Sequence, residues 1–447
     1  MKKSCRSLTT ISFTSALIVF SSSVSAQFMQ NLTIGSPKAM ALAHAVTADP
    51  PGIDSIHFNP AGLAKIKSNE FNSKFFGAYV TIEASLTGYP HEEGNEICPG
   101  TSPGSNACLF DIPDPLRPDD NPQSKTSNAS LILPFNGFHE SPALAGGAGG
   151  FALSKEGSRF TFANAFYMPL VVGFNRDDDD FARYNGKEVA LTRINYLSPS
   201  VGIRVTDKLS VGISVAAGWQ GMGLDLDMRA PNLGTAFLSA ACDDIGGTDT
   251  PEALVALCGA DIKYGPYDDV GNFVVQVEDS FSVSANVGFL YQVNNWLTVG
   301  AVYQSKSTAN MKGEFHFNYS NEWDTYWDDV VLGTVLPGAF PAGYGAHGDD
   351  GERGAVELKM VNPQHIAVGL SMIVTPLLKV NFDVKWTDQS TWDNLVLKFD
   401  QDLDFLTIAD TFDNIIELQD GPRYSGPNYT TFTCQYEAVT MNRPFYV

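Results

Sequence analysis

Long hydrophobic runs are what this sequence most clearly lacks. It is 447 residues long and 44% hydrophobic, yet past the N-terminus no apolar run reaches the roughly 18 residues of a membrane-spanning helix. The pattern excludes a helical membrane protein. It leaves a transmembrane β-barrel open, because lipid-facing and lumen-facing residues alternate along each strand and cancel in the average hydropathy.

Positive charge is scarce as well, with 28 Lys and Arg against 50 Asp and Glu and a formal net charge of -22. Nucleic-acid binding needs a basic face, so we expect no nucleic-acid partner. Neither His-Glu-x-x-His nor Gly-x-Ser-x-Gly occurs, and both are motifs of hydrolytic enzymes. The glycine-rich run at residues 146–150 opens no helix, which favours close packing of a wall against a plug over nucleotide binding. We expect no enzyme activity and no cofactor.

Residues 1–26 have the features of a secretory signal peptide. Lys2 and Lys3 precede a short apolar core at residues 8–20, and Ala26 ends a small-residue cleavage site. The mature chain is therefore expected outside the cytoplasm. In an oxidising compartment the sequence favours two local disulfides, each within a Pro/Gly-rich segment; the pairs are Cys98–Cys108 and Cys242–Cys258. Because no Cys-x-x-Cys spacing occurs, we expect no metal site.

From Leu378 to Thr387, apolar and polar side chains alternate strictly. Successive side chains of a strand point to opposite faces, so this segment predicts a strand with one apolar and one polar face. Its length of about ten residues is typical of a membrane-spanning strand, whereas globular strands average about five or six. The apolar set is Leu378, Val380, Phe382, Val384 and Trp386.

Similar segments recur along the chain. Predicted strands cover residues 71–88, 145–153, 159–174, 189–205, 209–229, 272–293, 296–318, 355–374 and 378–399. Tight turns join four pairs of them, at residues 154–158, 206–208, 294–295 and 375–377, and mostly long connections join the rest. Alternation of short turns with long loops is typical of outer-membrane barrels. The sequence thus predicts an all-β fold, a transmembrane antiparallel β-barrel of which nine or ten strands can be recognised.

A short motif, Asn59-Pro60-Ala61, precedes the first predicted strand. The motif and its position resemble the FadL family of outer-membrane transporters of hydrophobic compounds, as do residues 291–296 and 303–305. The resemblance covers residues 27 to about 403. It implies a fourteen-stranded barrel with a lumen plugged by an N-terminal hatch, a weak first binding site in the outer loops, and a kinked third strand through which substrate leaves sideways.

Four segments are expected: a signal peptide at 1–26, a hatch at 27–68, a barrel with long outer loops at 69–410, and an irregular tail at 411–447. In the hatch, proline at the first helical position predicts helices at 38–48, after Ser36, and at 61–66, after Asn59. Asn59, Pro60 and Ala61 are expected to hold the hatch to the wall. The tail lacks alternation, which predicts a barrel truncated or frameshifted before the family's last strands.

The third predicted strand contains Pro169. Proline has no N–H and restricts the residue before it, so it interrupts a ladder and belongs at a bulge or an edge. We predict that pairing fails within about two residues of Pro169 and that a hydrophobic tunnel leads from the hatch to this point. Phe166, Met168 and Leu170 are the candidate substrate contacts there, with Pro169 as the gating residue.

The loop at residues 230–271 carries apolar residues at helical spacing. They are Leu233, Phe237, Leu238, Leu254 and Leu257. Either they form a hydrophobic docking surface for substrate, or two short helices bury them against each other. Other loops are acidic, as at residues 177–180. Such residues are either a solvated surface or sites where divalent cations bridge to anionic surface lipid such as lipopolysaccharide.

The resulting hypothesis is a monomeric outer-membrane channel for passive uptake of long-chain fatty acids. Burial of apolar surface, at about 25 cal/mol per Å², would capture such solutes, and the hatch would force a lateral exit. Alternatives are a channel for small aromatic hydrocarbons, a general porin and a surface adhesin. A porin would have an open lumen and no apolar outer helices.

Overall fold

The computed structural model describes residues 36–85, 123–229, 264–265, 267–327, 351–388, 390, 394–401 and 431–435. The predicted signal peptide, the four cysteines of the two predicted disulfides and the five apolar residues of the 230–271 loop lie outside this part of the chain. Among the described residues no helix has the length and apolarity to span a membrane.

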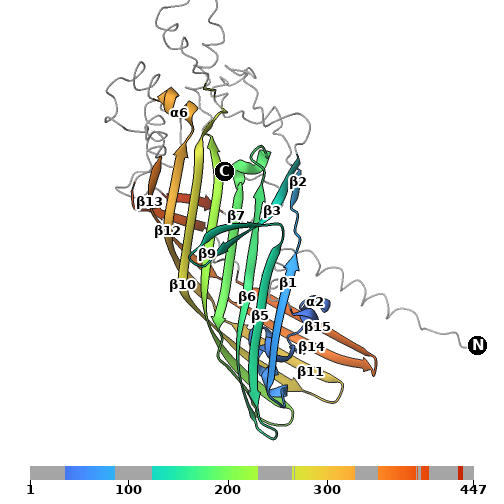
Figure 1. The fold of residues 1–447 in the computed structure, drawn as a ribbon. Helices are drawn as coiled ribbons and strands as arrows, with labels where there is room; N and C mark the ends of the chain where they lie inside the picture. Colours follow the sequence, from blue (N-terminus) through green and yellow to red (C-terminus); the bar gives the residue numbers. More distant parts are fainter. Residues whose placement is uncertain are drawn as a thin grey trace, which may run out of the picture.

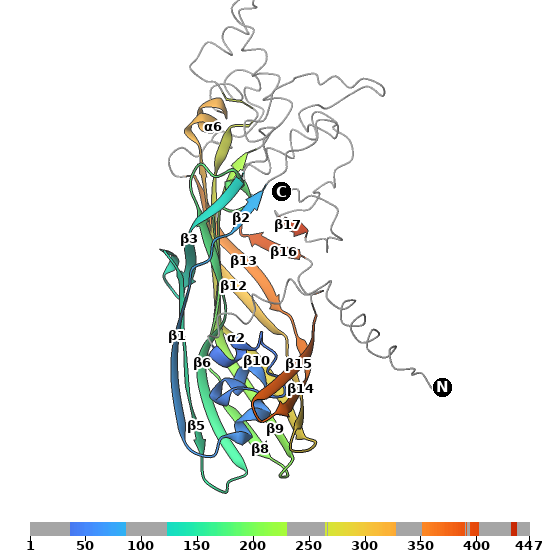
Figure 2. The same cartoon turned by 90° about the vertical axis from the view of Figure 1, so that its right-hand side faces the viewer.

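The described strands form a tall, curved antiparallel wall (Figures 1 and 2). They are β1 (Glu70–Ala78), β2 (Glu83–Ser85), β3 (Gln123–Leu133), β4 (Gly137–Ser141), β5 (Leu144–Ser154), β6 (Phe160–Arg176), β7 (Glu188–Leu197), β8 (Ser200–Arg204), β9 (Leu209–Arg229), β10 (Asp269–Gln292), β11 (Leu297–Gln304), β12 (Ser307–Tyr319), β13 (Glu352–Asn362), β14 (His365–Thr375), β15 (Leu378–Thr387), β16 (Asn394–Phe399) and β17 (Thr431–Gln435).

Neighbours in the wall follow the chain. β1 pairs with β5, β5 with β6, β6 with β7 and β8, and both of these with β9. β9 pairs with β10, and β10 with β11 and β12. β11 continues to β14 and β15, whereas β12 continues to β13, β16 and β17. Among the described strands β1 and β15 share no ladder, so these residues form a curved wall with an open side (Figure 2).

The four predicted tight turns are confirmed, because they connect β5 to β6, β8 to β9, β10 to β11 and β14 to β15. All four lie at the lower end of the wall in Figure 1. Five predicted strands were wrong as single strands, because each divides into two: 71–88, 189–205, 296–318, 355–374 and 378–399. Three of them divide at short breaks, at residues 198–199, 305–306 and 363–364. Two of these breaks contain a proline, Pro199 or Pro363, which cannot donate to a ladder.

The predicted alternation on β15 is confirmed by exposure. Its apolar residues are all exposed on the outer face: Leu378, Val380, Phe382, Val384 and Trp386. A similar exposed apolar set covers the lower halves of β9 and β10, including Ile213, Val215, Phe281 and Phe289. This belt has the composition of a surface that faces lipid.

A bulge reverses the alternation of β10. Its pairing with β9 shifts register between Asp279 and Ser282. Below the bulge the odd-numbered residue Phe281 is exposed, whereas above it Phe273, Val275 and Val277 are buried in the largest apolar cluster. One extra residue in a strand has this effect, because side chains alternate with period 2.

Four short helical elements lie against the inner face of the lower wall (Figure 2). They are α2 (Pro37–Ala41), η2 (Gly52–Asp54), α3 (Ser55–Phe58) and η3 (Pro60–Lys65). The helix predicted at 38–48 is therefore much shorter, and Ser36 makes no side-chain cap bond. The second predicted helix is the 3-10 helix η3, and Asn59 caps it by accepting a hydrogen bond from the Ala61 amide.

Candidate functional site

The polar face of β15 holds the N-terminal segment. Lys379 forms an ion pair with Asp49 at 2.6 Å. Further up the strand, Asn381 Nδ2 donates to the carbonyl of Ala45 at 2.8 Å, and Asp383 accepts from the amide of Thr47 at 2.9 Å. Lys385 Nζ also donates to the carbonyl of His44, at 2.8 Å. The apolar side chains of β15 therefore face outward, and these four polar side chains bind the segment.

Asn59 is the deepest anchor of the segment, with no exposed surface. Its Nδ2 donates to the carbonyl of Thr47 at 2.7 Å and to that of Phe289, on β10, at 3.2 Å. The wall approaches at glycines here: a Cβ on Gly212 would lie 2.2 Å from the Pro60 carbonyl carbon, and one on Gly288 would lie 2.1 Å from Asn59 Oδ1. Only glycine permits this contact between wall and segment.

The run at 146–150 contributes less to this contact than predicted. A Cβ on Gly150 would lie 3.0 Å from the side chain of Ile53 in the segment. The nearest atoms to Gly146 and Gly149 belong instead to Phe76 and Asn72 of β1. Of these three positions only Gly150 lies against the segment, and even there the nearest atom to an added Cβ is the Asn164 carbonyl oxygen of β6, at 2.6 Å.

Strand β6 is interrupted where Pro169 lies. Its register with β7 shifts between Tyr167 and Leu170, which face Asn195 and Arg193. On its other edge, the ladder with β5 ends at Phe166, and pairing resumes only at Asn175, with β3. The prediction of an interruption within two residues of Pro169 is confirmed.

The bulge decides which way the candidate contact residues point. Phe166 is 40% exposed on the outer face. Met168 packs in an outer cluster with Leu131 and Val171. Leu170 faces Arg193, whose side chain reaches Ser284 on the inner side. The three predicted contacts are therefore on two faces of the wall and do not line one surface.

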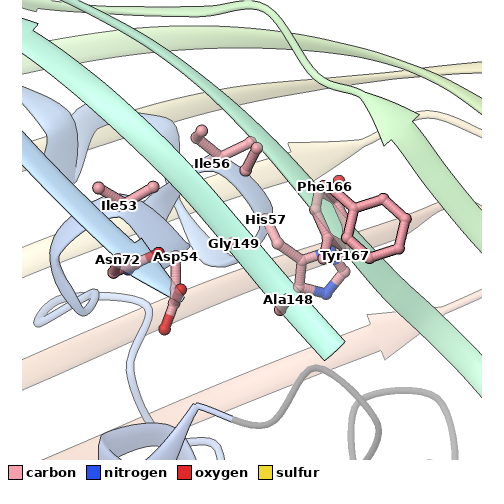
Figure 3. Close-up of a pocket in the computed structure, with 10 residues that line it drawn as sticks. Ile53, Asp54, Ile56, His57, Asn72, Ala148, Gly149, Phe166 and Tyr167 are labelled. Atoms are coloured by element: carbon pink, nitrogen blue, oxygen red, sulfur yellow. The ribbon is translucent and has the colours of Figure 1, made fainter. Parts of the chain in front are cut away.

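Among the described residues, the predicted tunnel is not open between the N-terminal segment and the interruption of β6. The space between the N-terminal segment and β5–β6 is about 10 Å³, which holds roughly one water molecule. Figure 3 shows His57 of α3 beside Tyr167 of β6, with ring centroids 5.3 Å apart in an edge-to-face arrangement. Aromatic packing closes the path between the segment and the bulge.

Arg193 is a buried charge beside the bulge, with 8% of its surface exposed. Its Nη2 donates to Ser284 Oγ at 3.3 Å, and its Nε has no hydrogen-bond partner in the described part of the chain. No carboxylate among the described residues forms an ion pair with it. Burial lowers the pKa of His57 well below its usual value, so Arg193 supplies positive charge here at neutral pH. An unpaired buried charge is costly, which makes this a strong anion-binding candidate.

The upper inner face is apolar. A single buried cluster includes Phe273, Phe315, Phe317 and Phe399 from three strands, together with Trp323, Tyr326 and Trp327. Trp323 belongs to α6 (Asn321–Thr325), at the top of the wall in Figure 1. Phe315 and Phe399 pack edge-to-face with centroids 4.9 Å apart. Above the hatch, the inner face of the wall therefore carries a continuous apolar cluster, which is buried in this structure.

The acidic run at 177–180 acts locally. Asp180 caps η4 (Phe181–Asn185) by accepting from the Ala182 amide at 2.7 Å, and Asp178 pairs with Lys187 at 2.6 Å. The lysine holds the pKa of Asp178 below its usual value. Within the described ranges no group of three or more His, Cys, Asp or Glu side chains is arranged to hold a metal ion. These contacts fit the interpretation of a solvated surface.

Sequence reasoning missed Arg193, which lies in a predicted strand and belongs to no motif. The available signal was the charge itself, because an ionisable residue within a predicted membrane strand is by default a functional candidate.

A family model described as "Outer membrane protein transport protein (OMPP1/FadL/TodX)" matches residues 15–432. The chain belongs to this family. It is accordingly an outer-membrane β-barrel protein that transports hydrophobic compounds, and the family consists of transport channels, not enzymes. The resemblance found in the sequence, the all-β fold class and the predicted location are confirmed.

Three solved structures are similar. The toluene transporter TbuX of Ralstonia pickettii is 16% identical, with 84% of this chain and 76% of that chain covered and a TM-score of 0.50. A Pseudomonas aeruginosa FadL homologue is 15% identical, with coverages of 82% and 72% and a TM-score of 0.49. The P. putida toluene transporter TodX is 14% identical, with coverages of 83% and 73% and a TM-score of 0.49. At such identity, the TbuX match supports the fold alone. Comparison with curated proteins finds no match.

Proposed function

We propose that the protein is a passive channel for long-chain fatty acids, plugged by its N-terminal segment and with a lateral exit at the interruption of β6. Arg193 carries this proposal. A fatty acid differs from a hydrocarbon by its carboxylate, and a buried guanidinium is the group best suited to bind one. Because Arg193 faces Leu170 just past the bulge, a carboxylate bound to it would lie at the start of the lateral path.

The apolar cluster above supports the same assignment. Aromatic and aliphatic side chains on β10, β12, β13 and β16 would contact the alkyl chain. Each fully buried methylene group contributes about 0.8 kcal/mol, so a long chain gains several kcal/mol there before its carboxylate is bound. A water-filled porin would have a polar lumen, so this apolar lining argues against a general porin. The close packing of His57 against Tyr167 also argues against a porin.

The test compares oleate with oleyl alcohol, which has the same alkyl chain and no carboxylate. In cells or vesicles that contain the protein, Arg193→Met should lower oleate uptake and leave oleyl alcohol uptake unchanged. A charge-assisted hydrogen bond contributes about 1.5–3 kcal/mol, so a loss of roughly 10- to 100-fold is expected.

Two control variants accompany this test. Arg193→Lys keeps the charge and should retain part of the oleate uptake. Lys312→Met removes an exposed outer cation, 72% exposed, and should change nothing. Equal loss for oleate and oleyl alcohol would contradict a carboxylate role. Uptake of toluene without any uptake of oleate would favour the aromatic hydrocarbon alternative.

A further inference from the structure

A small hairpin leaves the plane of the wall beside β6. The lower half of β3, residues 129–133, pairs with β4 instead of continuing along β6. Its turn contains Phe135, with a φ of 59°, and ends at Gly137, with a φ of 67°. Figures 1 and 2 show that this hairpin crosses several strands on the face opposite the N-terminal segment. It is therefore an element of the outer surface.

The hairpin lies on the outer face of β7 and β9, against Trp219 and the small residues Ala190 and Gly223. Ile132 packs with Ala190 and Trp219, and a Cβ on Gly223 would lie 2.4 Å from the ring of Phe138. Gly223 is on the same face of β9 as the exposed residue Ile213, since ten residues separate them and side chains alternate with period 2. A large side chain at Gly223 would therefore lift the hairpin off the wall.

The hairpin covers the interruption of β6. Leu131 packs with Met168 and Val171, one on each side of Pro169. Just above, the carbonyl of Ser130 approaches so closely that a Cβ on Gly173 would lie 2.0 Å from it. Because no described strand pairs with this edge of β6 between Phe166 and Asn175, the hairpin is what separates the gap from the surroundings of the barrel.

Few polar contacts fix the hairpin in place. Ser130 bonds to Glu188, Asn175 donates to Glu140 at 2.8 Å, and the Phe135 amide donates to Glu278 at 3.1 Å. The hairpin's own five-pair ladder keeps it rigid. Its two connections to the wall are irregular: the register shifts between residues 126 and 128, and residues 142–143 separate β4 from β5. Rigid units with irregular connections are suited to hinge motion.

We infer that the hairpin at residues 129–141 is the lid of the lateral exit, closed in this structure. This inference rests on the proposed function. Lifting the hairpin would expose the gap beside Pro169 to lipid, and closing it would shield the unpaired edge of β6, which would be costly to leave bare in a bilayer. With the lid closed, the wall has no opening beside Pro169 even though the ladder of β6 is interrupted there.

The height of the hairpin indicates where substrate would leave. Its tip residue, Phe135, is 81% exposed and bonded to Glu278, near the upper end of the apolar belt at Phe281. At that level the outer face becomes charged, because Lys312 faces Glu278 across the ladder and forms an exposed ion pair with Glu357. Girdles of aromatic residues flank the apolar band of membrane β-barrels at both interfaces. The exit would therefore open at the outer edge of the lipid-facing belt.

A cross-link tests the lid directly. Ser130→Cys with Glu188→Cys places two thiols where the side chains now bond, and a short cleavable bis-thiol reagent joins hairpin to wall. Oleate uptake should fall at least tenfold and return when the linker is cleaved, while oleate binding to the protein persists. Lys312→Cys with Glu357→Cys, which joins two strands already paired, should leave uptake unchanged. The parent protein and the two single-cysteine variants, treated with the same reagent, show whether native cysteines react and affect uptake. Full uptake by cross-linked protein would overturn the lid.

A second measurement does not depend on transport. Val171→Cys places a thiol beneath the hairpin, where Val171 is 3% exposed. Adding Gly223→Leu, which displaces Phe138, should increase its reaction rate with an apolar maleimide at least tenfold. Ala217→Leu on the same face of β9 should not. An unchanged rate with Gly223→Leu would show that the hairpin is fixed. If the rate rises but the parent takes up no oleate, the lid stands and the proposed substrate fails.

Discussion

Asn59 and Phe289 are 230 positions apart, and the side-chain amide of one donates to the main-chain carbonyl of the other at 3.2 Å. This bond links the N-terminal segment to β10 inside the wall. The same amide nitrogen also lies 3.3 Å from the carbonyl of Ala301 on β11. One side chain thus connects the segment to two neighbouring strands of the wall, β10 and β11.

Asn59→Ala should loosen this connection. The change leaves the buried Thr47 carbonyl without its donor, and an unsatisfied buried group costs about 1–3 kcal/mol. We expect a lower melting temperature and brief open events in planar-bilayer recordings. Asn69→Ala is the matched control, because Asn69 accepts an exposed hydrogen bond from Ser154. If the two variants have the same melting temperature and neither shows open events in planar-bilayer recordings, the anchoring role of Asn59 is contradicted.

Removing the segment tests whether it plugs the lumen. Deletion of residues 27–67 should leave the wall strands in place and produce a steady ionic conductance. The ion pairs and hydrogen bonds from Asp49, Thr47 and Ala45 to β15 would be lost, so a lower melting temperature is also expected. A folded deletion variant that conducts no more than the parent would exclude a plug.

Much of the wall could be predicted because its signals are local. Turn positions and the two faces of β15 follow from the neighbouring residues alone. Ser36 shows the limit: it has the sequence of an N-cap, but its side chain makes no cap hydrogen bond. The helix ends at Ala41, shortly before Ala43 and His44, which have positive φ angles of 47° and 63°. Propensity is a weak prior where packing decides.

The hairpin could not be predicted, because its residues face two different neighbours. Leu131 packs beside β6, whereas Ile132 packs beside Ala190 and Trp219. Two consecutive buried residues break the alternation that identifies a strand. The inversion of β10 above Asp279 was hidden for a similar reason: a bulge moves every later residue to the other face, and no residue type marks it.

The apolar residues of the 230–271 loop remain a prediction. If Leu233 and Phe237 belong to a docking surface, replacing both with Ser should weaken binding of a fluorescent fatty acid. Each lost side chain removes about 1.5–3 kcal/mol of apolar burial. Binding at parental strength with a reduced melting temperature would support helices that pack only on each other. Ser210→Ala, in the lower part of β9, serves as a variant remote from the loop.

Restoring regular pairing in β6 tests the lateral path. The register shift between Tyr167 and Leu170 contains one residue more on β6 than on β7, so deleting Pro169 should let the two strands pair without a bulge. Uptake of oleate should fall sharply, while fluorescent fatty acid still binds, because the outer loops are untouched. Pro169→Val, which supplies an N–H but keeps the extra residue, should have a smaller effect.

The control for this deletion is a second bulge. Pairing between β14 and β15 shifts register between Ile373 and Thr375, close to a tight turn and on strands that do not pair with β6. Deleting Val374 removes that irregularity and should not alter uptake. If the deletions of Pro169 and Val374 reduce uptake equally, the loss comes from a general change in the barrel and not from closing the gap in β6. If deletion of Pro169 leaves uptake intact in a folded protein, substrate does not leave through this gap, and release into the periplasm past the N-terminal segment becomes the better mechanism.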